Sequence, residues 1–204
     1  MDDRAAQAFA LRIAPSAAAV ANFCDHIEHN EVADRAWVLD TAEYLRCSVT
    51  EFCATRDLSL TDLFAERLGE IEARNVLRAP GAFDGQHIAL QARSWRDLQV
   101  VQASHDRHYH PDVIGLSKLD QLRHYALHLA KIVGAFAQPD DTIDLLHRRL
   151  PDTALFAIKL STVMGARLTD EPLPDCAAQA TAGTSSAAPS KPALGRFSTP
   201  HLGG

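Results

Sequence analysis

Apolar side chains recur every three or four residues along most of this 204-residue chain, and this spacing limits the folds that it can adopt. The longest example consists of Leu119, Leu122, Ala126, Leu129, Val133 and Phe136. Residues with this spacing share one face of an α-helix, whereas a half-buried β-strand would alternate at every second residue. No such alternation of strand length occurs. The sequence therefore predicts an all-α fold, a compact bundle of about six helices.

Residues that can cap helices divide this pattern into segments. Ser, Thr and Asp mark helix starts because their side-chain oxygens accept bonds from backbone amides that have no partner in the first turn. The expected helices run from Ser16 to about Asn30, onward to about Ala54, and from Ser59, Asp84, Ser117 and about Asp141. The helix from Asp84 should continue through Leu98 and end at a polar loop, residues 104–115.

Proline marks a break near the end of the pattern. Pro151 lacks an amide hydrogen and its ring clashes with the preceding turn, so the last helix must kink or restart there. Residues 154–164 are apolar nearly all round, which is typical of a central, buried helix.

Composition changes sharply at Asp170. Residues 170–204 consist mainly of Ala, Ser, Thr, Pro and Gly, with few large apolar side chains. Such a segment cannot recover its ordering entropy through burial. We therefore expect a helical domain over 1–169 and a disordered tail over 170–204.

Charge and composition exclude several classes of function. The chain has 20 basic and 26 acidic residues and a net charge of -6, with its Lys and Arg residues scattered, which argues against a nucleic-acid-binding surface. It has no apolar run long enough for a membrane span and no secretory signal. Its four cysteines form no CxxC pair. A cytoplasmic protein that binds neither nucleic acid nor membrane is expected.

The densest group of reactive side chains lies between residues 105 and 128, which include five of the ten histidines. Asp120, His124 and His128 are each one helical turn apart, and neutral imidazoles in such a row can share a metal ion. The row lies roughly 160° around the helix from the apolar stripe. It therefore faces either solvent or a second, polar crevice.

These residues suggest a metal-assisted hydrolase that acts on a phosphorylated or nucleotide-like small molecule and uses a divalent ion. The candidate metal ligands are His105, His110, His124 and His128. The carboxylates expected to orient these ligands or to act as a base are Asp106, Asp112 and Asp120. The expected substrate contacts are Arg107, Tyr109 and Lys131.

A second class of function remains open. In it, the histidine row is a wet surface in which Asp120 pairs with His124, and the chain is a non-catalytic module that binds or regulates a partner. The apolar last helix or the tail would then mediate assembly, and a homodimer is one form that this could take. Elsewhere, Glu66 and Glu70 form an acidic row, which Arg67 and Arg74 are close enough to neutralise as ordinary salt bridges.

The stretch from 122 to 168 resembles the paired metal-binding helices of MazG-type nucleotide pyrophosphohydrolases. The run HLAKIVGAFA, residues 128–137, is similar to their first metal helix, with Gly134 at the glycine of that motif. The run RRLPDTALFAIKLSTVMG, residues 148–165, is similar to the second, and Asp152 matches an acidic ligand.

The resemblance implies an all-α fold but not an intact magnesium site. Where the family carries glutamates, this chain has Lys131, Ile132, Ala135 and Arg149. Magnesium prefers carboxylate oxygens, so these departures remove the family's mechanism from those positions. The resemblance thus implies a site that was lost or rebuilt around His124 and His128, with anion contacts from Lys131, Arg148 and Arg149.

Overall fold

Helices account for all the named elements of the computed structural model, which describes residues 3–75, 83–137 and 145–173. The α-helices are α1 (Asp3–Glu28), α2 (Arg35–Ala54), α3 (Leu60–Asn75), α4 (Gly85–Ala89), α5 (Trp95–Tyr109), α6 (Pro111–Ile114), α7 (Lys118–Ala137) and α9 (Leu150–Val163). A π-helical turn, η1 (Leu145–Arg149), leads directly into α9. Six of the described α-helices have 14 residues or more, which confirms the predicted all-α bundle.

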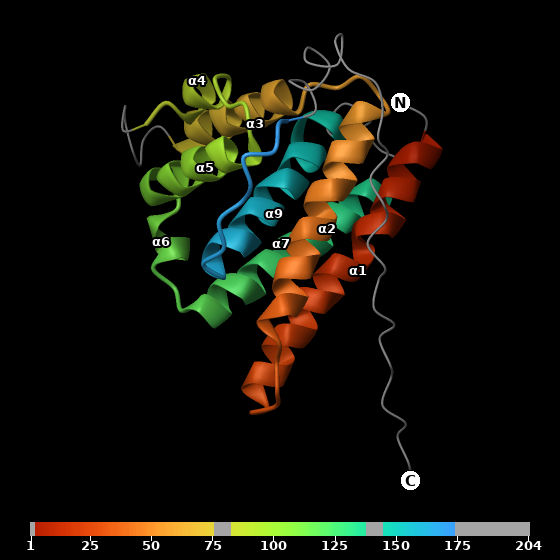
Figure 1. Ribbon diagram of the computed structural model, residues 1–204, viewed down its shortest axis with the longest axis vertical. Coiled ribbons are helices and arrows are strands. Elements are labelled where there is room, and N and C mark those ends of the chain that lie inside the picture. The colour runs from red at the N-terminus through yellow and green to blue at the C-terminus, as the bar shows by residue number, and fades with distance from the viewer. Residues whose placement is uncertain (1–2, 76–82, 138–144, 174–204) are drawn as a thin grey trace.

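The central element of the bundle is α9. It packs against α2, α3, α5 and α7, and all twelve residues from Leu150 to Ser161 are buried. Figure 1 shows α1 and α2 along one side of α9, with α3, α4 and α5 across the other. The prediction of a central apolar helix is confirmed. A helix buried on all sides cannot offer the exposed apolar face that the partner-binding hypothesis placed on it.

Long helices on the α1 side bury the apolar stripes that the sequence predicted. Helix α1 packs against both α2 and α7. At their junction the ring of Phe9 lies 4.8 Å from that of Phe52 and 5.0 Å from that of Phe136, measured between centroids. Such tilted aromatic contacts add to the area burial that stabilises the bundle.

Two predicted helix starts are confirmed by their caps. The amide of Asp62 donates to Ser59 Oγ (3.1 Å) at the start of α3, and the amide of Asp120 donates to Ser117 Oγ (3.2 Å) at the start of α7. Among the described residues, no helix combines the length and apolar composition needed to cross a bilayer.

The first helix begins earlier than predicted. It starts at Asp3 rather than at Ser16, and it runs through Pro15. Apolar residues on both sides of the proline, including Ile13 and Val20, are buried in the same core. Their burial outweighs the one backbone hydrogen bond that an internal proline removes.

The helix predicted from Asp84 is two helices. Asp84 caps the short α4, and Ser94 then starts α5 with a capping box. In this box Ser94 Oγ accepts from the Asp97 amide (3.2 Å) and the Asp97 carboxylate accepts from the Ser94 amide (3.0 Å). The sequence pattern through Ile88 and Leu98 is continuous, but this local cap separates the two axes.

The loop predicted over 104–115 is also wrong. Helix α5 continues to Tyr109 and α6 follows after one residue. The apolar pattern fails here because the inward face of α5 carries polar side chains: Gln102, His105 and Asp106 are buried. A helix that buries a polar face gives no apolar periodicity for a sequence pattern to detect.

The chain after α9 packs back along α5. Gly165, with a φ of 70°, ends α9 in a Schellman motif: its amide bonds Thr162 O (2.9 Å) and the Ala166 amide bonds Ser161 O (2.8 Å). We call residues 165–173 the C-terminal strap. The Trp95 amide donates to Glu171 O (3.3 Å) and the Leu173 amide to Arg93 O (3.1 Å).

This strap places the end of the folded domain later than predicted. Residues 170–173 belong to it rather than to the tail, and the side chain of Leu173 is fully buried. The rest of the predicted tail, 174–204, lies outside the described residues, as does the start of the sixth helix near Asp141. The predicted restart at Pro151 is confirmed, because Pro151 lies in the first turn of α9.

Candidate functional site

The end of α5 brings together three potential metal ligands. One ligand atom from each of His105, Asp106 and His110 lies within 4.8 Å of the other two. His105 and Asp106 are buried and His110 is half-buried. We call these three residues the histidine cluster. Two of the predicted metal ligands, His105 and His110, thus lie close together in space. The third member, Asp106, is one of the carboxylates predicted to orient the ligands or to act as a base.

His105 is the most unusual member of the cluster. Its side chain is completely buried, and neither ring nitrogen has a hydrogen-bond partner within the described part of the chain. The closest charged group is Glu72, whose Oε1 lies 3.6 Å from His105 Nε2. Burial lowers the pKa of His105 to about 4, so the ring is neutral at pH 7. A neutral imidazole is the form that ligates metals.

Asp106 joins the cluster to α9. Its Oδ1 accepts from Lys159 Nζ at 2.8 Å and from Gln102 Nε2 at 2.9 Å. The Asp106 and Lys159 side chains are each only 8% exposed, which makes this a buried ion pair. The Lys159 ammonium also lies 5.8 Å from the ring centroids of Tyr125 and Phe156. Such partners offset part of the cost of removing the two side chains from water.

His110 occupies the junction between α5 and α6. Its amide donates to Asp106 O (2.9 Å) and ends α5, and the residue also precedes the first turn of α6. Burial, and then the charge of Lys159, lower the pKa of the His110 ring. Like His105, it is held in the ligand-competent neutral form.

His124 and His128 form a separate pair on α7. Their ring centroids are 4.5 Å apart, and the His128 ring stacks on Phe156 at 5.1 Å. The pKa of His128 is lowered to about 4 and that of His124 is also lowered, in both cases mainly by burial. The pair interacts electrostatically with His110 but is not part of the three-residue cluster.

His124 and His128 are less exposed than expected for residues predicted to lie nearly opposite the apolar stripe of their helix. Tyr125 and Ile132 are buried, which widens the buried face of α7 beyond the predicted stripe. The histidines therefore lie half-buried at the margin of that face, against α9, rather than on the opposite side of the helix.

Two predicted site residues have structural roles instead. Tyr109 is buried, and its hydroxyl donates to Phe83 O at 2.6 Å, which ties α5 to the segment before α4 and leaves no substrate contact for that group. The Asp120 carboxylate accepts from the capping hydroxyl of Ser117 and forms an ion pair with Arg123 (2.8 Å), so it supports the start of α7 rather than orienting a histidine.

The other predicted residues lie around the cluster. Asp112 is exposed on α6 and interacts electrostatically with His110 and His124. Lys131 is exposed on α7, where its charge acts on the His124–His128 pair. Arg107 is exposed at the end of α5 and lines a groove.

This groove of about 380 Å³ lies between α5, α6, α7 and α9, directly beside the cluster. Its lining residues are Gln102, Ala103, Asp106, Arg107, Ile114, Lys118, Gln121, Tyr125, Lys159, Thr162 and Val163. Asp106 belongs to both the groove and the cluster. Sequence reasoning missed Lys159, although a single lysine in an otherwise apolar helix is a signal that it has a buried partner.

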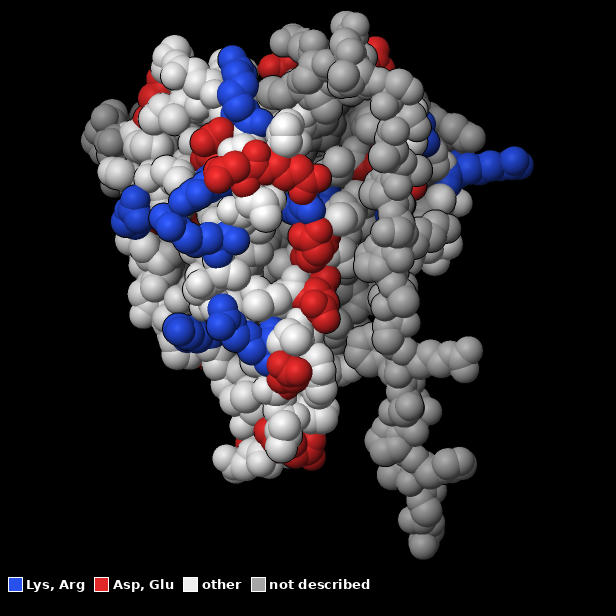
Figure 2. Space-filling model, in the orientation of Figure 1, with Lys and Arg blue, Asp and Glu red and all other residues white. Residues whose placement is uncertain are grey.

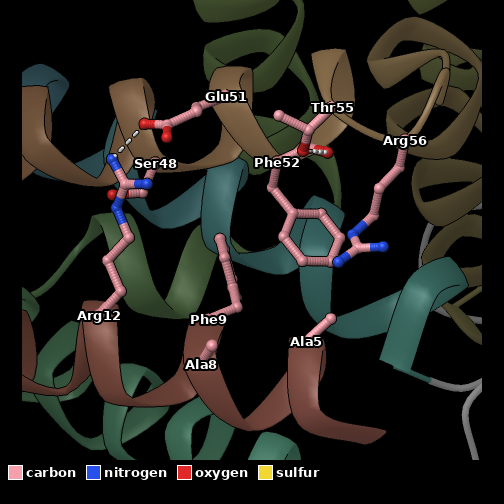
Figure 3. A pocket seen from close by; sticks show the side chains of 9 residues that line it. All are labelled: Ala5, Ala8, Phe9, Arg12, Ser48, Glu51, Phe52, Thr55 and Arg56. Atoms are coloured by element: carbon pink, nitrogen blue, oxygen red, sulfur yellow. Dashed lines mark hydrogen bonds and ion pairs between the residues drawn. The ribbon is translucent and has the colours of Figure 1, made fainter. Parts of the chain in front are cut away.

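A second hollow, of about 170 Å³, lies between α1 and α2 (Figure 3). Its charged groups already have partners: Arg12 Nη2 bonds Glu51 Oε2 (2.6 Å), and the Arg56 guanidinium lies 4.6 Å from the Phe52 ring centroid. No group of potential metal ligands like the histidine cluster lies there among the described residues. The groove beside α5 is therefore the better candidate site.

Asp152, the residue that matches a MazG-type acidic ligand, does not offer a free carboxylate because an arginine is paired with it. Arg67 bonds both oxygens of Asp152, at 2.6 and 3.2 Å, and both side chains are mostly buried. Arg67 and Arg74 also pair with Glu70 (2.8 and 3.3 Å), which confirms the predicted salt bridges for that member of the acidic row, whereas Glu66 pairs with His147 (2.7 Å). A guanidinium occupies the place that a cation would take, so this region is a structural ion-pair network.

Comparisons with known proteins add no further assignment to this site. The chain matches no model of a protein family, no curated protein and no solved structure.

Proposed function

We propose that the histidine cluster binds one divalent transition-metal ion, and that the protein uses it to hydrolyse a small anionic molecule held in the adjacent groove. The observation that carries the proposal is the convergence of His105, Asp106 and His110 within 4.8 Å in a buried site. The unpartnered ring nitrogens of His105 support it, because a buried imidazole without partners is destabilising unless something else binds it.

The donor set favours a transition metal over magnesium. Imidazole nitrogens suit zinc, iron, copper and nickel, whereas magnesium prefers oxygen ligands. His105, Asp106 and His110 would hold the ion, which would supply a nucleophile for hydrolysis by lowering the pKa of a water molecule.

Neighbouring residues have distinct tasks in this proposal. Asp106 would bind the ion through Oδ2, because Lys159 and Gln102 both bond Oδ1. Glu72, 3.6 Å from His105 Nε2, would orient that ring, as carboxylates commonly do for metal-bound histidines. Asp112, which is exposed on α6 and interacts electrostatically with His110, would accept a proton.

Metal analysis tests the proposal directly. Protein purified under reducing conditions, in keeping with the expected cytoplasmic location, is stripped with chelator, reloaded with zinc, iron, copper or nickel, desalted and measured by mass spectrometry. We expect close to one ion per chain, lost in His105→Leu and in His110→Ala. His108→Ala is the matched control, because His108 is on the same helix but exposed.

Two results would refute the proposal. One is less than a tenth of an ion per chain after reloading with each metal. The other is equal metal content in His110→Ala and wild type. If the metal is instead lost in His124→Ala and His128→Ala alone, the ion site lies on α7, where the sequence first placed it. Chain mass in solution, measured on the same samples, tests the expectation of a homodimer.

A further inference from the structure

The groove beside the histidine cluster is lined by both cationic and apolar side chains. Among the described residues that line it, three are cations, Arg107, Lys118 and Lys159, and one is an acid, Asp106. Arg107 and Lys118 are exposed at the rim, whereas Lys159 is buried below them. Basic side chains also gather on the α5 and α7 side of the molecule in Figure 2. An excess of positive charge in a concave site attracts anions.

The apolar part of the lining limits what else the occupant carries. Tyr125, Ile114 and Val163 contribute aromatic and aliphatic surface, and Gln102, Gln121 and Thr162 contribute hydrogen-bonding groups. A volume of about 380 Å³ is at the small end of ligand sites. A doubly charged phosphate on a short apolar or aromatic group fits three cations and this apolar surface better than a singly charged carboxylate does.

Lys159 is the cation with the greatest potential to bind an anion, and Asp106 controls it. The ammonium is desolvated, so its attraction for a phosphate would be far stronger than that of a surface lysine. At 2.8 Å, however, Asp106 Oδ1 neutralises it. Because Asp106 also belongs to the histidine cluster, an ion bound there would draw charge from the same carboxylate.

We propose that the groove binds a small phosphate monoester and that Asp106 couples this binding to the metal. With the metal bound, Asp106 shares its charge with the ion, and Lys159 is released to bind the phosphate at the floor of the groove. The positive charge of the ion would also attract the phosphate. This inference rests on the proposed metal site and adds the class of substrate and the regulation of its binding.

Coupling of this kind is reciprocal. If the metal tightens phosphate binding, the phosphate tightens metal binding by the same factor. Couplings between two ligand sites are typically fivefold or more, so we expect about a tenfold change in each direction.

The test is calorimetric titration of phenyl phosphate into full-length protein, either stripped of metal or loaded and desalted. We expect the metal-loaded protein to bind about tenfold more tightly, and benzoate, with the same ring and one charge, to bind more weakly than phenyl phosphate. Lys159→Met should remove most of the difference between the two forms and leave only the smaller contribution of the ion's own charge. Because that change leaves Asp106 buried without its partner, circular dichroism must show that the variant folds.

Surface variants keep the test informative if Lys159→Met does not fold. Arg107→Gln and Lys118→Gln replace exposed side chains and should each weaken phenyl phosphate binding several-fold, with less effect at high salt. Lys131→Gln is the matched control, because Lys131 is an exposed lysine of α7 that does not line the groove.

The outcomes separate the two proposals. Metal binding with equal affinity for phenyl phosphate in both forms would overturn the coupling and leave the metal site intact. Benzoate binding as tightly as phenyl phosphate would overturn the substrate class. Absence of metal binding would overturn the coupling together with the proposed function.

Discussion

Replacing His105 with leucine should change how the stability of the metal-free protein depends on pH. His105 is completely buried, with a pKa of about 4 in the folded chain against 6.5 as its ordinary value. Between these two values the unfolded chain binds a proton at this position and the folded chain does not. The free energy of unfolding therefore rises with pH across this window, and the stability is lost as pH falls from about 6.5 toward 4.

The size of this effect follows from the two pKa values. Taking 6.5 for the unfolded chain and about 4 for the folded chain, His105 alone lowers the free energy of unfolding by about 2 kcal/mol between pH 7 and pH 5. His128, with a pKa also lowered to about 4, adds a smaller effect of the same sign because it is half-exposed. The His105→Leu variant should therefore retain only the shallower part of the acid slope.

At pH 7 the same variant should be as stable as wild type or more stable. Leucine has a similar volume, favours helix, and removes two ring nitrogens that lack hydrogen-bond partners in the described part of the chain. A buried unsatisfied polar group destabilises a fold by about 1 to 3 kcal/mol, so a gain of about 1 kcal/mol is expected. A histidine with a purely structural role would give a loss instead.

Urea unfolding of both chains at pH 7 and pH 5, in chelator, measures the slope and the offset together. His108→Leu is the control, since His108 is exposed on the same helix. A loss above about 2 kcal/mol at pH 7, or an acid slope equal to that of wild type, would refute the reasoning that His105 is buried, neutral and unpartnered.

Three further predictions concern the scaffold around the site, and thermal and urea unfolding check each of them. Arg67→Leu should destabilise the fold by about 3 kcal/mol, because it removes both hydrogen bonds to the buried Asp152 carboxylate and leaves it only the longer contact with Arg149 (3.8 Å); if the double change with Asp152→Leu does not recover much of this loss, the pair is not the cause. Leu173→Ala should destabilise by about 3 kcal/mol while Leu11→Ala, at a side chain 77% exposed, stays near zero; equal effects would contradict the packing of the C-terminal strap. Tyr109→Phe should lose about 1 kcal/mol through the bond to Phe83 O and leave metal content unchanged, so a lost ion would restore Tyr109 to the site.

Sequence spacing was sufficient for the parts of the fold that bury apolar stripes. The stripes of α2 and α7, the caps at Ser59 and Ser117, and the restart at Pro151 are all where the pattern predicted them. These features depend on neighbours within one or two helical turns, so a single sequence contains them.

Features that depend on distant partners could not be predicted in this way. Residues 170–173 of the C-terminal strap have the composition of a tail, and their tertiary contacts, such as those with Arg93 and Trp95, show that they belong to the fold. Pairing of Arg67 with Asp152 joins residues 85 positions apart, and nothing local to either one indicates it. Tertiary contacts of this kind override local composition.

The site lies where the local pattern and the structure disagree most. Residues 104–109 were predicted as a loop because a helix was expected to bury apolar side chains, yet α5 buries Gln102, His105 and Asp106. In the same way, Lys159 interrupts the most apolar helix and lies against Asp106. A chain that only had to fold could fill these positions with apolar residues and avoid the desolvation of two charges and an unpartnered imidazole. Because such local inconsistencies lower stability, they are expected mainly where a function requires them, and here they converge on one cluster and one groove.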